Sequence, residues 1–224
     1  CFRLPFYVVG FLCLVVTMVV FFRFGNVQAK EGDKSAPISS VLTYKRMLSL
    51  IAIALNGTIV ATLDPTLSNK LFGPPFEYDA DKVGLLFTVS SVLYIVTSMP
   101  VGWMMDKSAS YGPQLKSKVC KITQALGFFM LAVCFTLLGP WKVGAASLDR
   151  LCNNVPSVWI AMMFKGMGSA GNNAGYPDIA IGISESDGMR QATLAGLWNA
   201  AYAIGWAAGP LLGGMMYGGF GFAT

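Results

Sequence analysis

The sequence predicts an all-α membrane protein, a bundle with six transmembrane helices. Of its 224 residues, 54% are hydrophobic and 25 are glycine, whereas only 12% are charged. Soluble domains contain about 45–50% apolar residues and about 25% charged residues. The charged residues are also gathered between long uncharged stretches, a distribution that is typical of chains crossing a membrane several times.

Six stretches are long and apolar enough to span a bilayer, which requires about 20 residues. They cover residues 4–22, 47–68, 83–104, 119–140, 156–181 and 190–217. Because these stretches use most of the chain, the connections leave no room for a separate soluble catalytic domain. We therefore expect the function to reside among the helices.

Lysines and arginines in the connections predict the orientation, since basic residues are retained on the cytoplasmic side of a membrane. Ten of them lie in or beside connections 24–46, 105–118 and 182–190, and five lie on the opposite side. We expect these three connections to be cytoplasmic. Because the basic residues are spread over several loops, the charge of +5 does not indicate a nucleic-acid surface.

The first connection predicts the domain organisation, because residues 24–40 have the Lys-, Glu-, Gly- and Ser-rich composition of a flexible linker. Residues 1–23 are then the last helix of a preceding, N-terminal bundle, and residues 24–46 form a cytoplasmic inter-bundle loop. Residues 47–224 form a C-terminal bundle of five helices that lacks its final helix. Since the chain opens with Cys1, we expect it to be a fragment.

Residue types that most enzymes need are missing or lie in the wrong context. The sequence has no histidine, the commonest general base and transition-metal ligand, and its five cysteines follow no metal-binding pattern. The glycines of residues 166–171 match a dinucleotide fingerprint, but they lie in an apolar span with no preceding strand, where small residues allow helices to pack closely. We expect no enzymatic activity, cofactor or metal.

The second span contains an acidic residue, which is costly in a membrane and therefore indicates a functional site. Asp64 precedes Pro65, whose missing N–H frees a backbone carbonyl nearby, and Asn56 lies on the same helical stripe two turns earlier. We predict that Asp64 takes part in proton or cation coupling. A plainer alternative is that Asp64 ends its helix in the hydrated interface.

The fifth span carries a polar stripe at helical spacing, which we expect to face protein or water rather than lipid. Lys165, Asn172 and Tyr176 lie on this stripe, and Asn173 adjoins it. Lys165 lies about ten residues into the span, too deep to reach the surface easily, so it needs an anionic partner or a cavity. A purely structural ion pair is the competing explanation.

Three motifs resemble the major facilitator superfamily. Residues 102–107, Gly-Trp-Met-Met-Asp-Lys, resemble the loop signature of that superfamily, and residues 205–214 are similar to the Gly-x-x-x-Gly-Pro-x-x-Gly-Gly pattern of its drug and proton antiporters. Residues 63–68, Leu-Asp-Pro-Thr-Leu-Ser, resemble the acidic-Pro-x-Leu segment of helix seven in the vesicular amine transporter branch. The resemblance covers essentially the whole chain.

This resemblance implies a partial bundle, helices six to eleven of a twelve-helix transporter. It also implies a set of residues that control alternation between conformations rather than contact the substrate: Gly102, Asp106, Lys107, Gly205, Gly209, Pro210, Gly213 and Gly214. Among them, Gly102 would allow close helix approach and Asp106 would engage a basic group or a helix N-terminus. Asn172 and Asn199 stand where vesicular amine transporters carry membrane aspartates. Because an amide does not ionise, this difference argues against monoamine transport as that branch performs it.

The residues and the resemblance together predict proton-coupled antiport of a small organic solute by alternating access. The expected partners are the solute, protons, the lipid bilayer and the remaining helices of the same transporter. Beside Asp64, the expected cavity wall consists of Asn56, Lys165, Asn172, Tyr176 and Asn199. Lys165 favours an anionic or zwitterionic solute unless it is ion-paired or turned away. An uncoupled facilitator and a non-transporting, half-length membrane protein remain alternatives.

Overall fold

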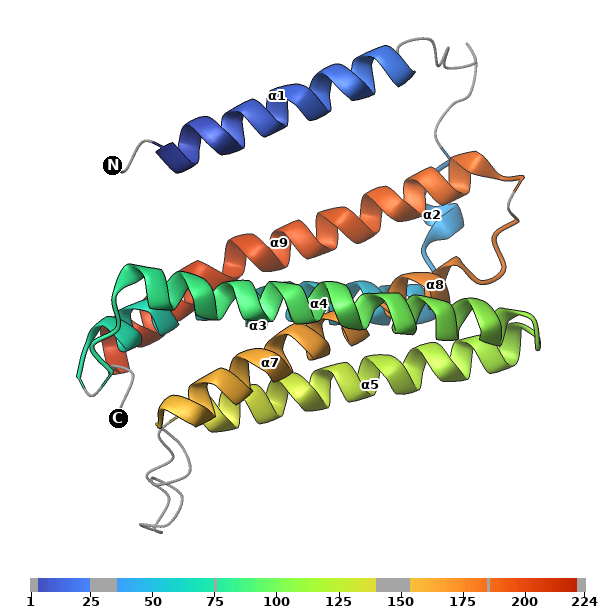
Figure 1. Cartoon of the computed structure of the whole chain (residues 1–224). Coiled ribbons are helices and arrows are strands. Elements are labelled where there is room, and N and C mark those ends of the chain that lie inside the picture. Colours follow the sequence, from blue (N-terminus) through green and yellow to red (C-terminus); the bar gives the residue numbers. More distant parts are fainter. Residues whose placement is uncertain (1–3, 25–35, 75, 140–153, 185, 221–224) are drawn as a thin grey trace. The chain divides into compact units, whose positions relative to one another are not determined.

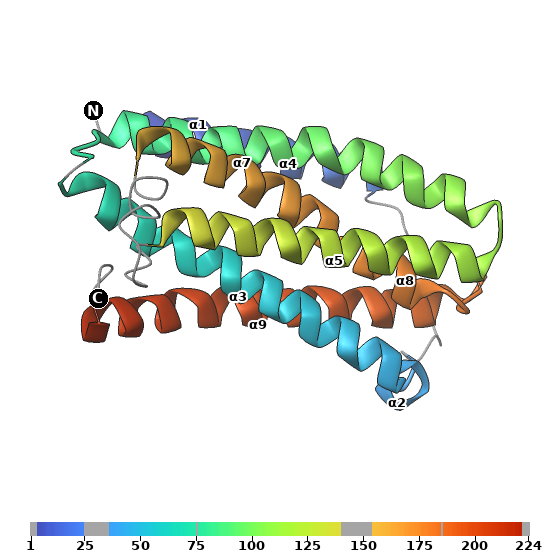
Figure 2. The same ribbon diagram turned by 90° about the horizontal axis from the view of Figure 1, so that it is seen from below.

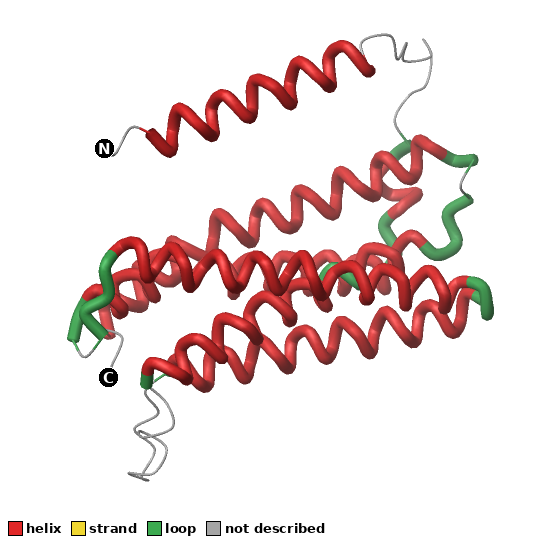
Figure 3. Tube along the Cα trace, viewed as in Figure 1, coloured by secondary structure: helices red, strands yellow, loops and turns green. Residues whose placement is uncertain are grey.

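The computed structural model describes residues 4–24, 36–74, 76–139, 154–184 and 186–220. Every regular element in these ranges is a helix, as Figure 3 shows. The chain divides into two compact units, Cys1–Ser35 and Ala36–Thr224, which we describe separately.

The first unit contains one helix, α1 (Leu4–Phe24), which is apolar on all sides. A helix without a polar face is stable only where lipid or other helices surround it. Its central threonine keeps its hydroxyl satisfied within the helix, because Thr17 Oγ1 donates to the carbonyl of Cys13 at 2.8 Å. The sequence of α1 is therefore compatible with a membrane.

The second unit is a bundle of long helices. Its elements are α2 (Ile38–Val41), α3 (Tyr44–Phe72), α4 (Ala80–Ala109), α5 (Pro113–Leu138), α7 (Val155–Asn172), α8 (Gly175–Ala180) and α9 (Gly188–Phe220). Helix α3 packs along α9, and α7 packs on both α4 and α5 (Figures 1 and 2). Among the described helices, α3, α4 and α5 are long and apolar enough to cross a membrane.

The connections of the second unit gather at its two ends. Figures 1 and 2 show α2, the α4–α5 connection and the α8–α9 connection at one end, with the α3–α4 connection and the start of α7 at the other. The described parts of connections 24–46, 105–118 and 182–190, which the sequence predicts to share one side of the membrane, therefore lie at the same end of the unit. We call this the basic end of the unit.

The helices extend further than the apolar stretches of the sequence. The predicted loop 105–118 is longer than the observed connection, which consists of residues 110–112, because α4 continues to Ala109 and α5 begins at Pro113. Within the predicted loop 24–46, α2 forms and α3 begins at Tyr44, and α9 begins within the predicted loop 182–190. Hydropathy marks only the part of a helix that lies in hydrocarbon, so the polar turns at its ends are missed.

The prediction of one continuous helix over residues 156–181 is wrong, because the chain breaks between α7 and α8. At the break, the N–H of Ala174 donates to Gly171 O at 3.1 Å, and the N–H of Tyr176 donates to Asn173 O at 3.2 Å. Pro177 has no N–H with which to continue the helical ladder. Helix α8 therefore begins as a separate helix, and the polar stripe of α7 does not continue into α8.

The two larger apolar clusters of the bundle lie at different levels. One cluster contains Leu67, Leu86 and Met162, and the cluster nearer the basic end contains Ile53 and Ile179. Along α3 the polar residues Asn56 and Asp64 lie between Ile53 and Leu67, and along α7 and α8 Lys165 and Asn172 lie between Met162 and Ile179. The polar residues therefore occupy a layer between the two apolar clusters.

Glycines bring α9 into close contact with α3. A Cβ on Gly209 would lie 2.7 Å from the carbonyl oxygen of Thr58, and a Cβ on Gly213 would lie 2.9 Å from Thr62 Cγ2. A Cβ on Gly205 would overlap the carbonyl oxygen of Ala54. Glycines four residues apart thus remove the side-chain bulk from one face of α9, as is common where membrane helices pack.

Candidate functional site

An ion pair joins α3 and α7 in the polar layer. Lys165 Nζ lies 3.3 Å from Asp64 Oδ1. Asp64 does not end its helix, since α3 continues to Phe72. The helix passes Pro65 intact, and Thr62, Thr66 and Ser68 each donate their hydroxyl to the carbonyl four residues earlier. Asp64 is thereby presented from the side of a continuous helix.

The lysine of this pair is held by α4 as well as by the aspartate. Lys165 Nζ lies 4.8 Å from the centre of the Phe87 ring, within the range of a cation–π interaction. The next residue, Gly166, lets α7 approach α4, because a Cβ there would overlap the carbonyl oxygen of Ser90. Close backbone packing therefore places the ammonium group between an aromatic ring and a carboxylate.

A cavity of about 470 Å³ opens beside the ion pair. Four helices line it: α3, α4, α7 and α9. Its walls combine aromatic rings, small hydroxyl groups and the two charges, and the lining residues are Val60, Asp64, Phe87, Ser90, Ser91, Tyr94, Ile95, Lys165, Gly166, Ser169, Tyr202 and Trp206. Cavities with mostly apolar walls and a few convergent polar groups are typical binding sites for small molecules.

The two charges are unequally accessible. The side chain of Lys165 is 8% exposed, whereas that of Asp64 is 41% exposed. The cavity therefore offers an approaching solute mainly a carboxylate, while the ammonium group remains covered by its neighbours. The sequence favours an anionic or zwitterionic solute only if Lys165 is unpaired, and the structure shows that Lys165 is paired.

A second polar pair crosses from α7 to α3 nearer the basic end. Asn172 Nδ2 donates to Asn56 Oδ1 at 2.8 Å, and both side chains are buried. Asn172 Oδ1 has no hydrogen-bond partner among the described residues. It faces Gly127 of α5, where a Cβ would lie 2.5 Å from it. Asn56 and Asn172 are thus part of the polar layer without lining the cavity.

The other polar residues that the sequence singled out lie elsewhere. Asn173 donates its amide to the hydroxyl of Tyr94 at 2.6 Å, so it supports a wall residue rather than forming the wall. Tyr176 packs edge-to-face on Trp198, with ring centres 5.7 Å apart. Asn199 is exposed and donates to the carbonyl of Ala195 in its own helix at 3.0 Å.

The predicted conformational residues also divide into two groups. Gly205, Gly209 and Gly213 form the contact with α3, whereas Gly214 faces open space and Pro210 is exposed. A Cβ on Gly102 would meet no described atom within 4 Å, so the close helix approach predicted there is not made within the described ranges. Asp106 is exposed, and Lys107 lies over the ring of Trp103 at 4.9 Å.

Helix α4 and much of α9 contribute wall residues that were not predicted from the sequence. Ser90, Ser91 and Tyr94 come from α4, and Tyr202 and Trp206 come from α9. A signal for α4 is present in the sequence, since Ser90 and Tyr94 are polar residues four positions apart within an apolar span. Neither residue is charged, which is why a search for ionisable groups in the spans does not find them.

The Asn56–Asn172 hydrogen bond is expected to contribute to stability. Replacing Asn56 with alanine leaves the buried amide of Asn172 without its partner, and we expect a loss of about 1–2 kcal/mol. Thermal unfolding of the purified protein in detergent measures the change. The exposed Asn199→Ala variant is the matched control, with an expected change within about 0.5 kcal/mol. Equal losses in both variants would contradict the predicted role of Asn56.

Comparison with known proteins identifies the family. The sequence model of the Major Facilitator Superfamily matches residues 47–224, more than half of the chain. The chain belongs to the major facilitator superfamily. It is also similar to the human MFS-type transporter SLC18B1, with 25% identity over 234 residues, covering 99% of this chain and 46% of the relative. No solved structure matches the chain significantly.

These matches and the helices make the chain an integral, multi-pass membrane protein of a transporter family, related to the vesicular amine transporter branch. The chain spans about half the length of the curated relative that it matches.

Proposed function

We propose that this chain is part of a secondary active transporter that exchanges a small organic solute for protons by alternating access. The observation that carries the proposal is the Asp64–Lys165 ion pair, which borders a cavity of about 470 Å³ between four helices. An ionisable pair inside a membrane bundle is costly and commonly marks an ion or substrate pathway. Membership of a transporter family supports the same assignment.

Competition for one carboxylate explains how such a site would couple solute and proton movement. Asp64, which pairs with Lys165 in the structure, would leave that pair either by taking up a proton or by pairing with a positively charged group of the solute. Because both need the same oxygens, the site binds a proton or a solute but not both. Mutually exclusive binding on the two sides of the membrane produces antiport.

The walls of the cavity favour a solute with a positively charged group. Asp64 is the more exposed of the two charges, and four aromatic side chains, Phe87, Tyr94, Tyr202 and Trp206, line the same space. Aromatic faces attract cations. Ser91 adds a hydroxyl group that donates to Phe87 O at 3.0 Å and can accept a hydrogen bond from a polar part of the solute.

The proposal also covers the orientation of the bundle in the membrane and its place in the whole transporter. We place the basic end, with connections 24–46, 105–118 and 182–190, in the cytoplasm, because basic residues are retained there. Residues 1–23 would close the preceding bundle, and residues 47–224 would form most of the next one. The remaining helices of the transporter would complete the cavity, and the surrounding lipid would contact the outer faces of the helices.

The test uses the full-length natural protein in liposomes that contain a trapped pH indicator and an acidic interior. A panel of small organic cations, zwitterions and acids is added outside. Tetraethylammonium is included because a quaternary ammonium carries no exchangeable proton. We expect at least one cation to raise the internal pH faster than in protein-free liposomes, since its entry drives protons out.

The same assay separates the alternatives when radiolabelled solute is followed in parallel. Solute that enters without a change in internal pH would indicate an uncoupled facilitator. If neither solute nor protons move for any member of the panel, the protein is a non-transporting membrane protein, and the proposal fails.

A further inference from the structure

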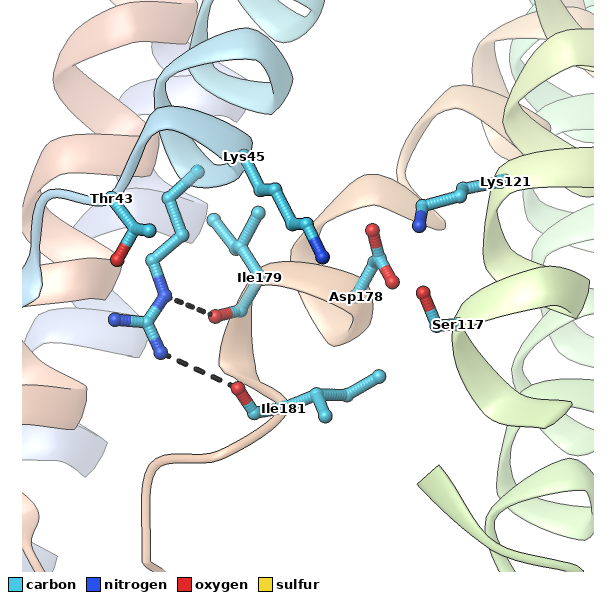
Figure 4. A pocket seen from close by; sticks show the side chains of 8 residues that line it. Thr43, Lys45, Ser117, Lys121, Asp178, Ile179 and Ile181 are labelled. Carbon is cyan, nitrogen blue, oxygen red and sulfur yellow. Dashed lines mark hydrogen bonds between the residues drawn. The ribbon is translucent and has the colours of Figure 1, made fainter. Parts of the chain in front are cut away.

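A second cavity lies at the basic end of the bundle, apart from the cavity beside Asp64. Figure 4 shows it between the first turn of α3, the part of α5 that carries Ser117 and Lys121, and the end of α8. Its volume is about 260 Å³. The side chains that give it its chemistry are Thr43, Lys45, Arg46, Ser117, Lys121 and Asp178.

Arg46 holds this cavity together. Its guanidinium donates to the carbonyl oxygens of Ile179 at 2.9 Å, Val41 at 2.9 Å and Ile181 at 3.3 Å. Two of these bonds appear in Figure 4. Carbonyls at the end of a helix have no partner within that helix, so Arg46 satisfies those of α8 and fixes α8 against α3. The arginine keeps its positive charge in the wall of the cavity.

Two lysines add charge from opposite sides. In Figure 4, Lys45 extends from α3 and Lys121 extends from α5, and both ammonium groups point into the space around Asp178. Neither ammonium group forms an ion pair or hydrogen bond with a residue of the described ranges. Three cations therefore face one carboxylate, which leaves the cavity with a surplus of positive charge.

The backbone adds to this positive potential. The cavity borders the first turn of α3, where the helix dipole places partial positive charge. The side chain of Thr43, the N-cap residue of α3, makes no capping hydrogen bond, and Ser117 presents a hydroxyl group from the second turn of α5. Ammonium groups, hydroxyl groups and helix starts are the donors that bind phosphate.

We propose that this cavity binds an anionic phosphate group, supplied by the headgroup of an acidic phospholipid. The helix ends that form it lie where a membrane protein meets the lipid headgroups, and basic pockets between membrane helices bind such headgroups. A phosphate bridging Lys45 and Lys121 would tie α3 to α5 beside the arginine that already anchors α8. The site is independent of the solute and proton pathway.

Binding is tested on the purified full-length protein in neutral detergent by native mass spectrometry. The probes are phosphatidylglycerol, phosphatidylcholine and inorganic phosphate. We expect phosphatidylglycerol to bind more tightly than phosphatidylcholine, and increasing salt to weaken it. Each of Lys45→Gln and Lys121→Gln should weaken phosphatidylglycerol binding about fivefold. Lys118→Gln is the matched control, because Lys118 is exposed on α5 and does not line the cavity.

Asp178→Asn distinguishes an anion site from an internal cluster in which the lysines serve only to neutralise the carboxylate. Removing the like charge should tighten phosphatidylglycerol binding if the cavity holds a phosphate. Binding of inorganic phosphate that depends on both lysines and displaces the lipid would support the site with a soluble anion as its source. Equal effects of Lys118→Gln and Lys45→Gln, or weaker binding in Asp178→Asn, would overturn the proposal.

Discussion

Gly205→Ala is expected to destabilise the protein by about 2–3 kcal/mol, a large loss for a single methyl group. The added Cβ would overlap the carbonyl oxygen of Ala54 and would lie 3.0 Å from the backbone nitrogen of Thr58. Backbone atoms cannot turn aside as the end of a long side chain can. The alanine therefore forces α9 away from α3, and neighbouring contacts such as the 3.1 Å approach of Thr62 Oγ1 to Gly209 O are strained.

Gly214→Ala is the control in the same helix. A Cβ on Gly214 meets no described atom within 4 Å, so the substitution adds helix propensity without a clash. We expect it to be neutral or to stabilise the protein by up to roughly 1 kcal/mol. Thermal unfolding of both variants in detergent measures the difference. If the two variants behave alike, glycine at position 205 is not required by the contact with α3.

Hydropathy predicted which segments form helices better than it predicted where those helices begin and end. Long apolar stretches require helices in a membrane because backbone groups must be satisfied within the segment, and α3, α4 and α5 confirm this. The break before α8 was not predicted, although Pro177 is the physical reason for it. An apolar sequence around a proline does not show whether a helix bends and continues or stops and restarts.

Only some residues of the site could be predicted from the sequence, and the break between α7 and α8 is one reason. A stripe with helical spacing identifies residues on one face only while the helix is continuous, so Tyr176, beyond the break, packs on Trp198. Of the stripe residues within α7, Lys165 lines the cavity, whereas Asn172 lies two turns further along and bonds to Asn56 instead. The partner of Lys165 was left open, since spacing within one helix does not show which side chain of another helix it meets. The pairing with Asp64 depends on how α3 and α7 are rotated relative to each other.

Asp64→Asn is expected to abolish proton-coupled accumulation of solute while exchange of solute across the membrane partly remains. An amide cannot take up and release a proton at physiological pH, so solute binding would no longer compete with protonation. The assay with the trapped pH indicator measures coupling, and exchange of labelled solute is followed in parallel. The control is Asp79→Asn, at an exposed position before α4, which should leave both activities unchanged. Normal accumulation in Asp64→Asn would show that another group couples the proton.

Stability should respond unequally to loss of the two charges. Asp64→Asn leaves the covered ammonium of Lys165 without its carboxylate, whereas Lys165→Gln leaves a carboxylate that is 41% exposed to the cavity. Breaking a fully buried pair costs about 3–5 kcal/mol and an exposed pair less than about 1. We therefore expect roughly 2 kcal/mol for Asp64→Asn and a smaller loss for Lys165→Gln.

The double variant Asp64→Asn with Lys165→Gln separates a structural ion pair from a coupling site. With both charges removed, no unpaired charge remains, so we expect stability close to that of the natural protein. Coupling should stay lost, because the restored stability does not restore a group that can bind a proton. If the double variant regains both stability and coupling, the pair serves only to hold α3 against α7. If the double variant regains stability but not coupling, Asp64 is the residue that binds the proton. Lys165 is then the residue that pairs with the carboxylate between transport events.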